Sequence, residues 1–161
     1  MYTKIIEELT KLEHEHFALS DSYESNGSYE MSYMALWTIL EHILKPIASE
    51  GMKKKLQRSL HEWIDHLESP VSGKKPKDIK SFKTEYSSTS IPPISLIEEA
   101  IGDVPKLKVL MDSNGKYRKK RNSIAHRAEK LSKSIYSDYK STVILALEEL
   151  RVVLQSHTER T

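Results

Sequence analysis

Apolar residues recur at steps of three and four along most of this chain, and that spacing constrains the fold more than any other feature. A period of 3.6 residues places such side chains on one face of an α-helix, and no segment alternates as a half-buried β-strand would. The chain holds only 5 Gly and 6 Pro among 161 residues, so long helices can run without interruption. We therefore predict an all-α protein that folds as a single domain over residues 1–161.

The apolar stripes predict four long helices, arranged as an up-and-down bundle with short helices between them. The long helices are expected over residues 2–20, from 29 to about 46, over 52–67 and over 132–157. Two features separate the second helix from the third: Pro46 predicts a kink or an early end, and Ser49-Glu50-Gly51 predicts a break. The apolar stripe of the third helix consists of Met52, Leu56, Leu60, Trp63 and Leu67.

Short helices are expected in the second half of the chain, over 93–101, from Pro105 onward and over 116–127. Gly102 suits the position just after a helix, and proline is well tolerated in a first helical turn. Residues 70–93 are rich in Pro, Gly, Ser, Thr and Lys and have no apolar period. We predict a flexible loop or a lid for that segment.

Composition excludes several kinds of site. The absence of cysteine rules out a disulfide framework and thiolate metal ligands. Glu62 and His66 make one usable pair on a helix, but the spacing supplies no third ligand, so neither a metal nor a cofactor is expected. The first residues do not resemble a signal peptide, and no segment is apolar enough to span a bilayer. We expect a cytoplasmic protein without a membrane partner.

The residues best suited to chemistry lie together in the hexapeptide Arg-Asn-Ser-Ile-Ala-His at 121–126. Histidine titrates near neutral pH and can act as base or acid, while arginine stays charged and fits phosphate oxygens. Metal-free RNA cleavage needs a base for the 2′-hydroxyl, an acid for the 5′-oxygen and a cation near the phosphorane. On a helix Asn122 and His126 share a face, whereas Arg121 lies roughly 140° around the axis from His126.

Positive charge surrounds this hexapeptide. Residues 116–133 contain eight Lys and Arg side chains and one acid, Glu129. Taken alone, such a run is more typical of a solvated surface than of a binding site. Its overlap with Arg121 and His126 favours RNA, because clustered cations bind phosphates through counterion release. The candidate RNA-binding residues are Lys116, Arg118, Lys119, Lys120 and Arg127.

An arginine, a polar residue and a histidine after four intervening positions resemble the R-x4-6-H signature of the HEPN superfamily. Members of that superfamily are small helical bundles, often dimeric ribonucleases of bacterial toxin and defence systems. Arg121, Asn122 and His126 match the signature in a chain of suitable size. Ala128 departs from it, because some HEPN toxins carry a tyrosine two residues after the histidine.

This resemblance implies a homodimer in which two copies of the signature helix supply two His126 and two Arg121 side chains to one site. One imidazole would take the 2′-hydroxyl proton and the other would protonate the 5′-oxygen, with Arg121 neutralising the phosphorane. Asn122 would position the imidazole or the phosphate. The expected activity is that of a metal-independent endoribonuclease of toxin or defence type, which leaves 2′,3′-cyclic phosphate and 5′-hydroxyl ends.

The resemblance also gives Glu41 a role. HEPN proteins often have an acidic residue on an earlier helix near the motif, so Glu41 is a candidate to orient Arg121; an ordinary exposed helix acid is the alternative. An antitoxin or a defence-system protein is the implied protein partner. Two other functions stay open: a non-catalytic HEPN-like module that binds RNA, a nucleotide or a protein, and a structural partner of a larger enzyme.

Overall fold

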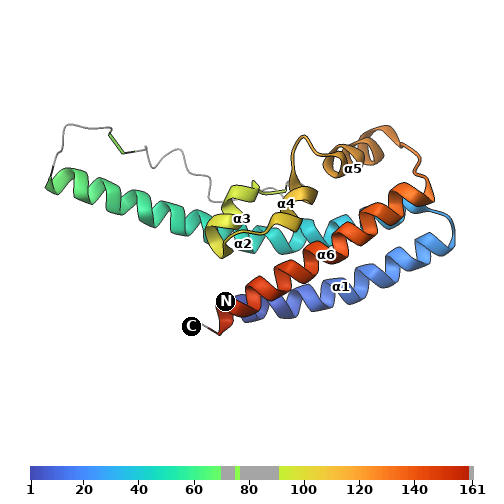
Figure 1. Cartoon of the computed structure of the whole chain (residues 1–161), viewed down its shortest axis with the longest axis horizontal. Helices are drawn as coiled ribbons and strands as arrows, with labels where there is room; N and C mark the ends of the chain where they lie inside the picture. Colours follow the sequence, from blue (N-terminus) through green and yellow to red (C-terminus); the bar gives the residue numbers. More distant parts are fainter. Residues whose placement is uncertain (70–74, 77–90, 160–161) are drawn as a thin grey trace.

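A computed structural model describes residues 1–69, 75–76 and 91–159 of the chain, and all regular structure within those ranges is helical (Figure 1). The helices are α1 (Tyr2–Ser25), α2 (Tyr29–Glu68), α3 (Ile94–Ile101), α4 (Pro105–Met111), α5 (Lys116–Arg127) and α6 (Lys133–Thr158). The all-α class is thereby confirmed. Most of the segment 70–93, predicted to be a loop or lid, lies outside the described residues.

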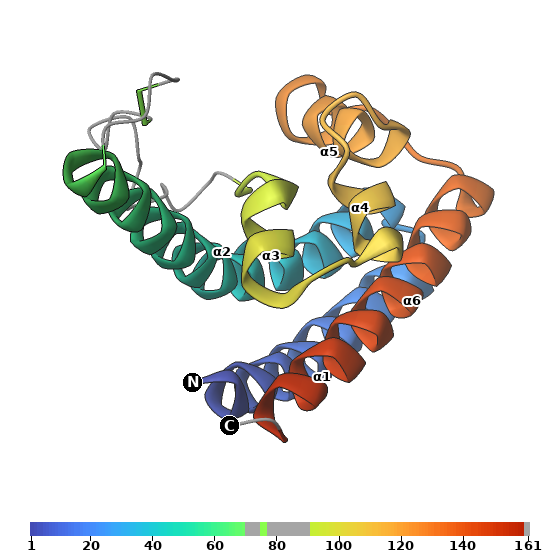
Figure 2. The ribbon, with the colours of Figure 1, turned by 60° about the vertical axis from the view of Figure 1, so that its left-hand side comes forward.

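The prediction of four long helices is wrong, because the second and third are one 40-residue helix, α2. Pro46 lies inside α2 with its side chain exposed, and Figure 2 shows α2 bending near its middle. A proline removes one intrahelical hydrogen bond and crowds the preceding turn, which bends a helix without ending it when the ring faces solvent. Neither the early end predicted at Pro46 nor the break predicted at residues 49–51 occurs, because α2 is continuous through both.

Gly51 has a packing role that its sequence context did not suggest. It is buried in α2 where α3 crosses, and a Cβ built on it would lie 1.9 Å from the main-chain carbonyl oxygen of Leu96. Only glycine allows α2 and α3 to approach this closely. The residue read as a helix breaker is thus a contact point between two helices.

The long helices α1, α2 and α6 pack together and enclose most of the core. The chain runs along α1 and returns along α2, after which α3, α4 and α5 carry it back, so that α6 runs in the same direction as α2 and ends beside the start of α1 (Figures 1 and 2). The long helices α2 and α6 are thus parallel, unlike successive helices of the predicted up-and-down bundle. The rings of Tyr2 and His157 contact each other at that end, tilted by 42° with 5.3 Å between their centroids. Fully buried leucines from all three helices, Leu9, Leu40 and Leu150 among them, fill the space between them.

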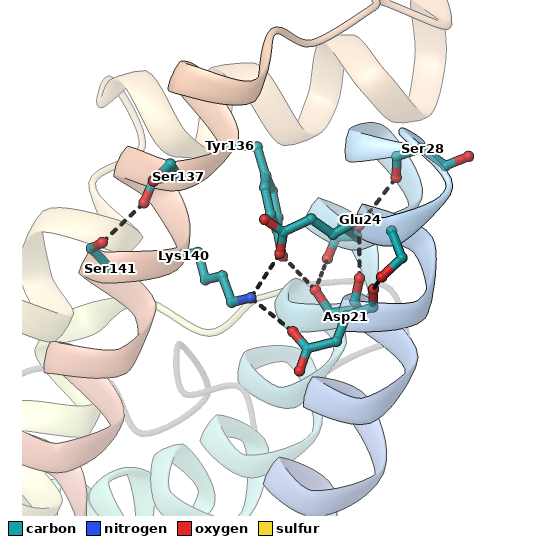
Figure 3. Close-up of polar contacts among 10 residues, drawn as sticks. Asp21, Glu24, Ser28, Tyr136, Ser137, Lys140 and Ser141 are labelled. Carbon is teal, nitrogen blue, oxygen red and sulfur yellow. Dashed lines mark hydrogen bonds and ion pairs between the residues drawn. The ribbon is translucent and has the colours of Figure 1, made fainter.

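Contacts with α6 extend α1 beyond its predicted end at residue 20. Lys140 on α6 donates to Asp21 Oδ1 at 2.7 Å and to Glu24 Oε2 at 2.8 Å, as Figure 3 shows. Next to them, the buried Ser20 hydroxyl lies 2.6 Å from Tyr136 OH. The polar residues 21–25 looked like a loop in the sequence, but these long-range partners hold them in the last turns of α1.

The short helices begin and end close to the predicted positions. Gly102, with a φ of +91°, follows α3, and Pro105 stands in the first turn of α4. The Ser132 hydroxyl accepts a hydrogen bond from the Ile135 backbone N–H at 3.4 Å and caps the start of α6. Because these signals are local, the sequence alone was enough to place them.

Candidate functional site

The signature residues lie on α5, the helix whose predicted bounds, 116–127, agree with the structure. This helix packs on α2 and α4, at the edge of the molecule away from α1 (Figures 1 and 2). Only Tyr117 of α5 is buried: its backbone oxygen accepts from Tyr33 OH at 2.7 Å, and its own hydroxyl donates to Asp138 at 2.9 Å. Asn122, His126 and Arg127 are among the α5 residues that are exposed and so available for contacts with other molecules.

One exposed side of α5 carries a shallow hollow of about 370 Å³. It is lined by Lys119, Asn122, Ser123, His126 and Arg127. The helical period brings Asn122 and His126 to this common face, as their spacing predicted. The His126 imidazole is exposed, with no hydrogen-bond partner among the described residues, so a bound molecule could reach it.

Arg121 does not line this hollow; it lies on the flank of α5 that faces α2. Its Nη2 donates to Glu41 Oε1 at 2.5 Å, and these two side chains are only 17% and 16% exposed. Nη1 lies 3.4 Å from Asn122 Oδ1, a long contact, and the buried Nε has no hydrogen-bond partner among the described residues. Glu41, the acid singled out in the sequence, thus holds Arg121 in place beside the hollow.

The predicted RNA-binding cations do not act as one patch. Lys116 pairs with Asp138 at 2.8 Å, and Lys120 pairs with Glu129 at 2.5 Å, so their charges are largely neutralised. Lys119 and Arg127 line the hollow and form no ion pair within the described residues. Arg118 faces a different groove, beside α3 and α4. The structure brings two of the five candidate cations together with His126.

Asp138, the acid that pairs with Lys116, lies on α6 and so anchors α5 to the bundle, whereas Glu129 directly follows α5 in the sequence. Hydrogen bonds from Lys116 and then Tyr117 lower the pKa of the Asp138 carboxyl, and the hydrogen bond from Lys120 lowers that of Glu129. Where the chain leaves α5, Glu30 Oε1 accepts from the backbone N–H of Leu131 at 2.6 Å. Burial of Glu30 would raise its pKa, but hydrogen bonds from backbone N–H groups, that of Leu131 first, lower it. Asp138 and Glu30 lie far from α5 in sequence, so no local signal identified them.

Aromatic residues form the floor beneath α5. Tyr33 and Tyr139 stack with 3.5 Å between ring centroids, and Trp37 lies alongside at 6.3 and 6.4 Å. All three are at most 1% exposed and belong to the core. Burial raises the pKa of Tyr139 well above its ordinary value and keeps its hydroxyl protonated. This rigid floor supports the Glu41–Arg121 pair from below.

Two further properties concern ions and membranes. Within residues 1–69, 75–76 and 91–159, no three His, Asp or Glu side chains are grouped so that they could hold a metal ion. None of the helices in those ranges is long and apolar enough to cross a bilayer.

Comparison with protein-family models, with curated proteins and with solved structures gave no match.

Proposed function

We propose that this protein is a HEPN-like, metal-independent endoribonuclease of toxin or defence type, with its site on the exposed face of α5. One observation carries the proposal: the accessible His126 imidazole shares a hollow with Asn122 and with two cations that form no ion pair in the described structure. A proton-transfer group beside phosphate-binding charges is the minimum that metal-free RNA cleavage requires.

The roles follow from where the side chains lie. His126 takes the 2′-hydroxyl proton or donates a proton to the 5′-oxygen, and Lys119 and Arg127 hold the flanking phosphates. Arg121 reaches the phosphorane only by exchanging Glu41 for a phosphate oxygen; while paired, it acts through Asn122, which its Nη1 contacts. While the pair is intact, Glu41 keeps the guanidinium at the edge of the hollow.

A second protomer completes the chemistry in this proposal. One chain offers a single histidine in the hollow, whereas the reaction uses both a base and an acid. A twofold pairing of α5 faces would bring a second His126 to the same phosphate, and twofold dimers are the commonest oligomers. An antitoxin or a defence-system partner would act by covering the same exposed face.

The strongest rival is a non-catalytic module that binds RNA through the hollow. One observation favours it: the Arg121 guanidinium, which should stabilise the transition state, is paired with Glu41 and lies outside the hollow. Under this alternative, His126 is dispensable for binding, whereas Lys119 and Arg127 are essential.

Incubation of the purified protein with total RNA in EDTA tests the proposal. The wild type should cleave RNA and leave 2′,3′-cyclic phosphate ends, and His126→Ala should abolish cleavage, since the proton-transfer group is gone. His14→Ala is the matched control, because His14 is an exposed histidine on α1. Cleavage that survives in His126→Ala would contradict the assignment.

If the wild type does not cleave RNA, measurements of RNA affinity test the rival function, that of a non-catalytic RNA-binding module. In that case the double variant Lys119→Ala/Arg127→Ala should weaken RNA binding, and His126→Ala should leave it unchanged. Lys4→Ala/Lys11→Ala, which removes the same charge from the exposed surface of α1, is the control. RNA affinity equal in all four proteins would leave neither function standing.

A further inference from the structure

A second groove lies next to the hollow, between α3, α4 and the first half of α5. It has a volume of about 610 Å³ and includes Arg118 in its lining. Its apolar lining comes from Ile91, Pro93, Ile94, Pro105, Val109 and Met111. Val109 is 55% exposed, so this apolar surface is open to solvent.

Arg118 is the charged group that this groove leaves available. It is part-buried and forms no ion pair within the described residues. Lys108, which also lines the groove, is neutralised by Glu98 at 2.8 Å. Asp112 keeps its negative charge at the groove, where its Oδ1 accepts from the Asn114 backbone N–H at 3.0 Å. An apolar groove with one available guanidinium suits a ligand that combines flat apolar faces with a single negative charge.

The groove continues the proposed RNA path. Arg118 and Asn122 are four residues apart on α5 and therefore lie on the same side of the helix, separated by roughly 6 Å along its axis. This separation is comparable with that between neighbouring phosphates of an extended strand. A strand whose phosphate lies against Asn122 and His126 can place its next phosphate at Arg118 and the attached base over the groove.

We propose that this groove binds an unpaired nucleobase of the RNA, one nucleotide away from the phosphate cleaved at His126. Arg118 holds the phosphate between them, and the prolines and branched side chains pack against the faces of the base. A base inside a duplex is stacked and cannot enter, so the groove selects single-stranded RNA. This inference rests on the proposed function of the α5 face and adds the class of RNA that it accepts.

The test compares single-stranded RNA with a matched duplex, as substrates for cleavage and as ligands in a binding assay. Val109→Asp puts a negative charge on the apolar groove, and Arg118→Ala removes its cation. Both should weaken binding of the single strand about tenfold, the loss expected for one base or phosphate contact. Val152→Asp on α6, at a valine that is 65% exposed, is the matched control and should change nothing.

A single-stranded RNA with one abasic nucleotide distinguishes a base contact in the groove from a general electrostatic effect on RNA binding. When strands with the abasic nucleotide at different positions are compared, binding to the wild type should weaken for one position only, next to the cleaved phosphate. Val109→Asp should show no further loss there, since its base contact is already gone. If each variant unfolds at the same temperature as the wild type, misfolding is excluded as the cause of a loss of affinity.

The outcomes of the two proposals can be told apart. If the wild type cleaves RNA and both groove variants behave like Val152→Asp, the groove inference is overturned and the proposed function stands. If cleavage is unchanged in His126→Ala, the proposed function is overturned, and the abasic strand still decides the groove. A wild type that neither binds nor cleaves single-stranded RNA would overturn both.

Discussion

At the scale of single residues, the Glu41–Arg121 pair is the contact on which the candidate site depends most. Both side chains are more than four-fifths buried, and Arg121 Nε has no partner in the described structure. A charge in such a place is tolerated only while its counter-charge is present, because removal of one partner leaves the other desolvated. The pair therefore holds the position of α5 on α2, whichever chemistry α5 performs.

Glu41→Gln should lower the free energy of unfolding by about 1–3 kcal/mol, because the amide cannot neutralise the guanidinium. Glu99→Gln is the comparison and should cost much less, since its bidentate partner Arg58 is 56% exposed and solvent screens such a pair. Denaturant unfolding measures both. Equal small losses would mean that Glu41 and Arg121 behave as a surface pair.

Ala128 ends α5 in a strained conformation, with φ +50° and ψ +38°. A side chain disfavours this left-handed region by roughly 1 kcal/mol, and glycine does not. Ala128→Gly should therefore raise the free energy of unfolding by about 0.5–1 kcal/mol. Ala125→Gly, at an exposed position inside α5, should lower it by about 1 kcal/mol. Thermal unfolding should show shifts of opposite sign, and shifts of one sign would contradict this account.

At the scale of elements, α2 and α3 meet at Gly51 through backbone rather than side chains. Helix propensity alone predicts that Gly51→Ala stabilises α2 by about 1 kcal/mol. The contact with Leu96 predicts the reverse: the new Cβ must displace α3, and overpacking of this kind costs roughly 1–3 kcal/mol. Chemical denaturation decides the sign. A stabilised Gly51→Ala would show that α3 moves aside at little cost.

Asp138 on α6 holds α5 on the bundle, and Glu129 holds Lys120 at the end of α5, so the stability of docked α5 should depend on pH. The pKa values of Asp138 and Glu129 are lowered from 3.8 and 4.5 in the folded protein. Because the folded-state pKa is lowered, each carboxylate stabilises the fold fully at a pH above its ordinary pKa. That stabilisation is lost as the pH falls below the ordinary pKa and through the folded-state pKa. Above pH 5 or so, docking should be insensitive to pH.

Hydrogen exchange of α5 amides, corrected for intrinsic rates, should accelerate as the pH drops from about 5 to 3, more than exchange in α1. Asp138→Asn and Glu129→Gln should flatten this dependence, because the titrating groups are gone. Glu7→Gln, at an exposed acid on α1, is the control and should leave it unchanged. An acceleration that persists in the double variant would point to other groups.

At the scale of the whole molecule, stability is concentrated where α1, α2 and α6 pack together. Buried residues of α2 extend from Ser32 to Ser59, and beyond them the helix projects from the bundle (Figure 1). Three apolar residues of that projecting end, Leu60, Ile64 and Leu67, are 43%, 50% and 72% exposed. The apolar stripe predicted for residues 52–67 is therefore buried only at its beginning.

Shortening a leucine side chain should lower the free energy of unfolding far more in the buried part of α2 than in its projecting end. Leu44→Ala removes a fully buried side chain and should cost about 2–5 kcal/mol, because it leaves a cavity in the core. Leu60→Ala should cost about 1 kcal/mol or less, since the side chain already contacts water. Chemical denaturation of the two variants tests this, and similar losses would mean that the projecting end is packed in solution.

The sequence by itself determined whatever depends on neighbours along the chain. The all-α class, the bounds of α5, the glycine after α3, the proline opening α4 and the common face of Asn122 and His126 all follow from local spacing and backbone preference. These features involve residues within a few positions of one another. For that reason they could be predicted without knowledge of the fold.

Tertiary structure alone decided the rest, because it joins residues that are far apart in sequence. Gly51 reads as a breaker until α3 lies against it, and residues 21–25 read as loop until Lys140 binds them. The sequence suggested Glu41 as a partner of Arg121, but only packing put the two side chains 2.5 Å apart. Packing also paired Lys116 and Lys120 with acids, so that Lys119 and Arg127 are the cations beside His126.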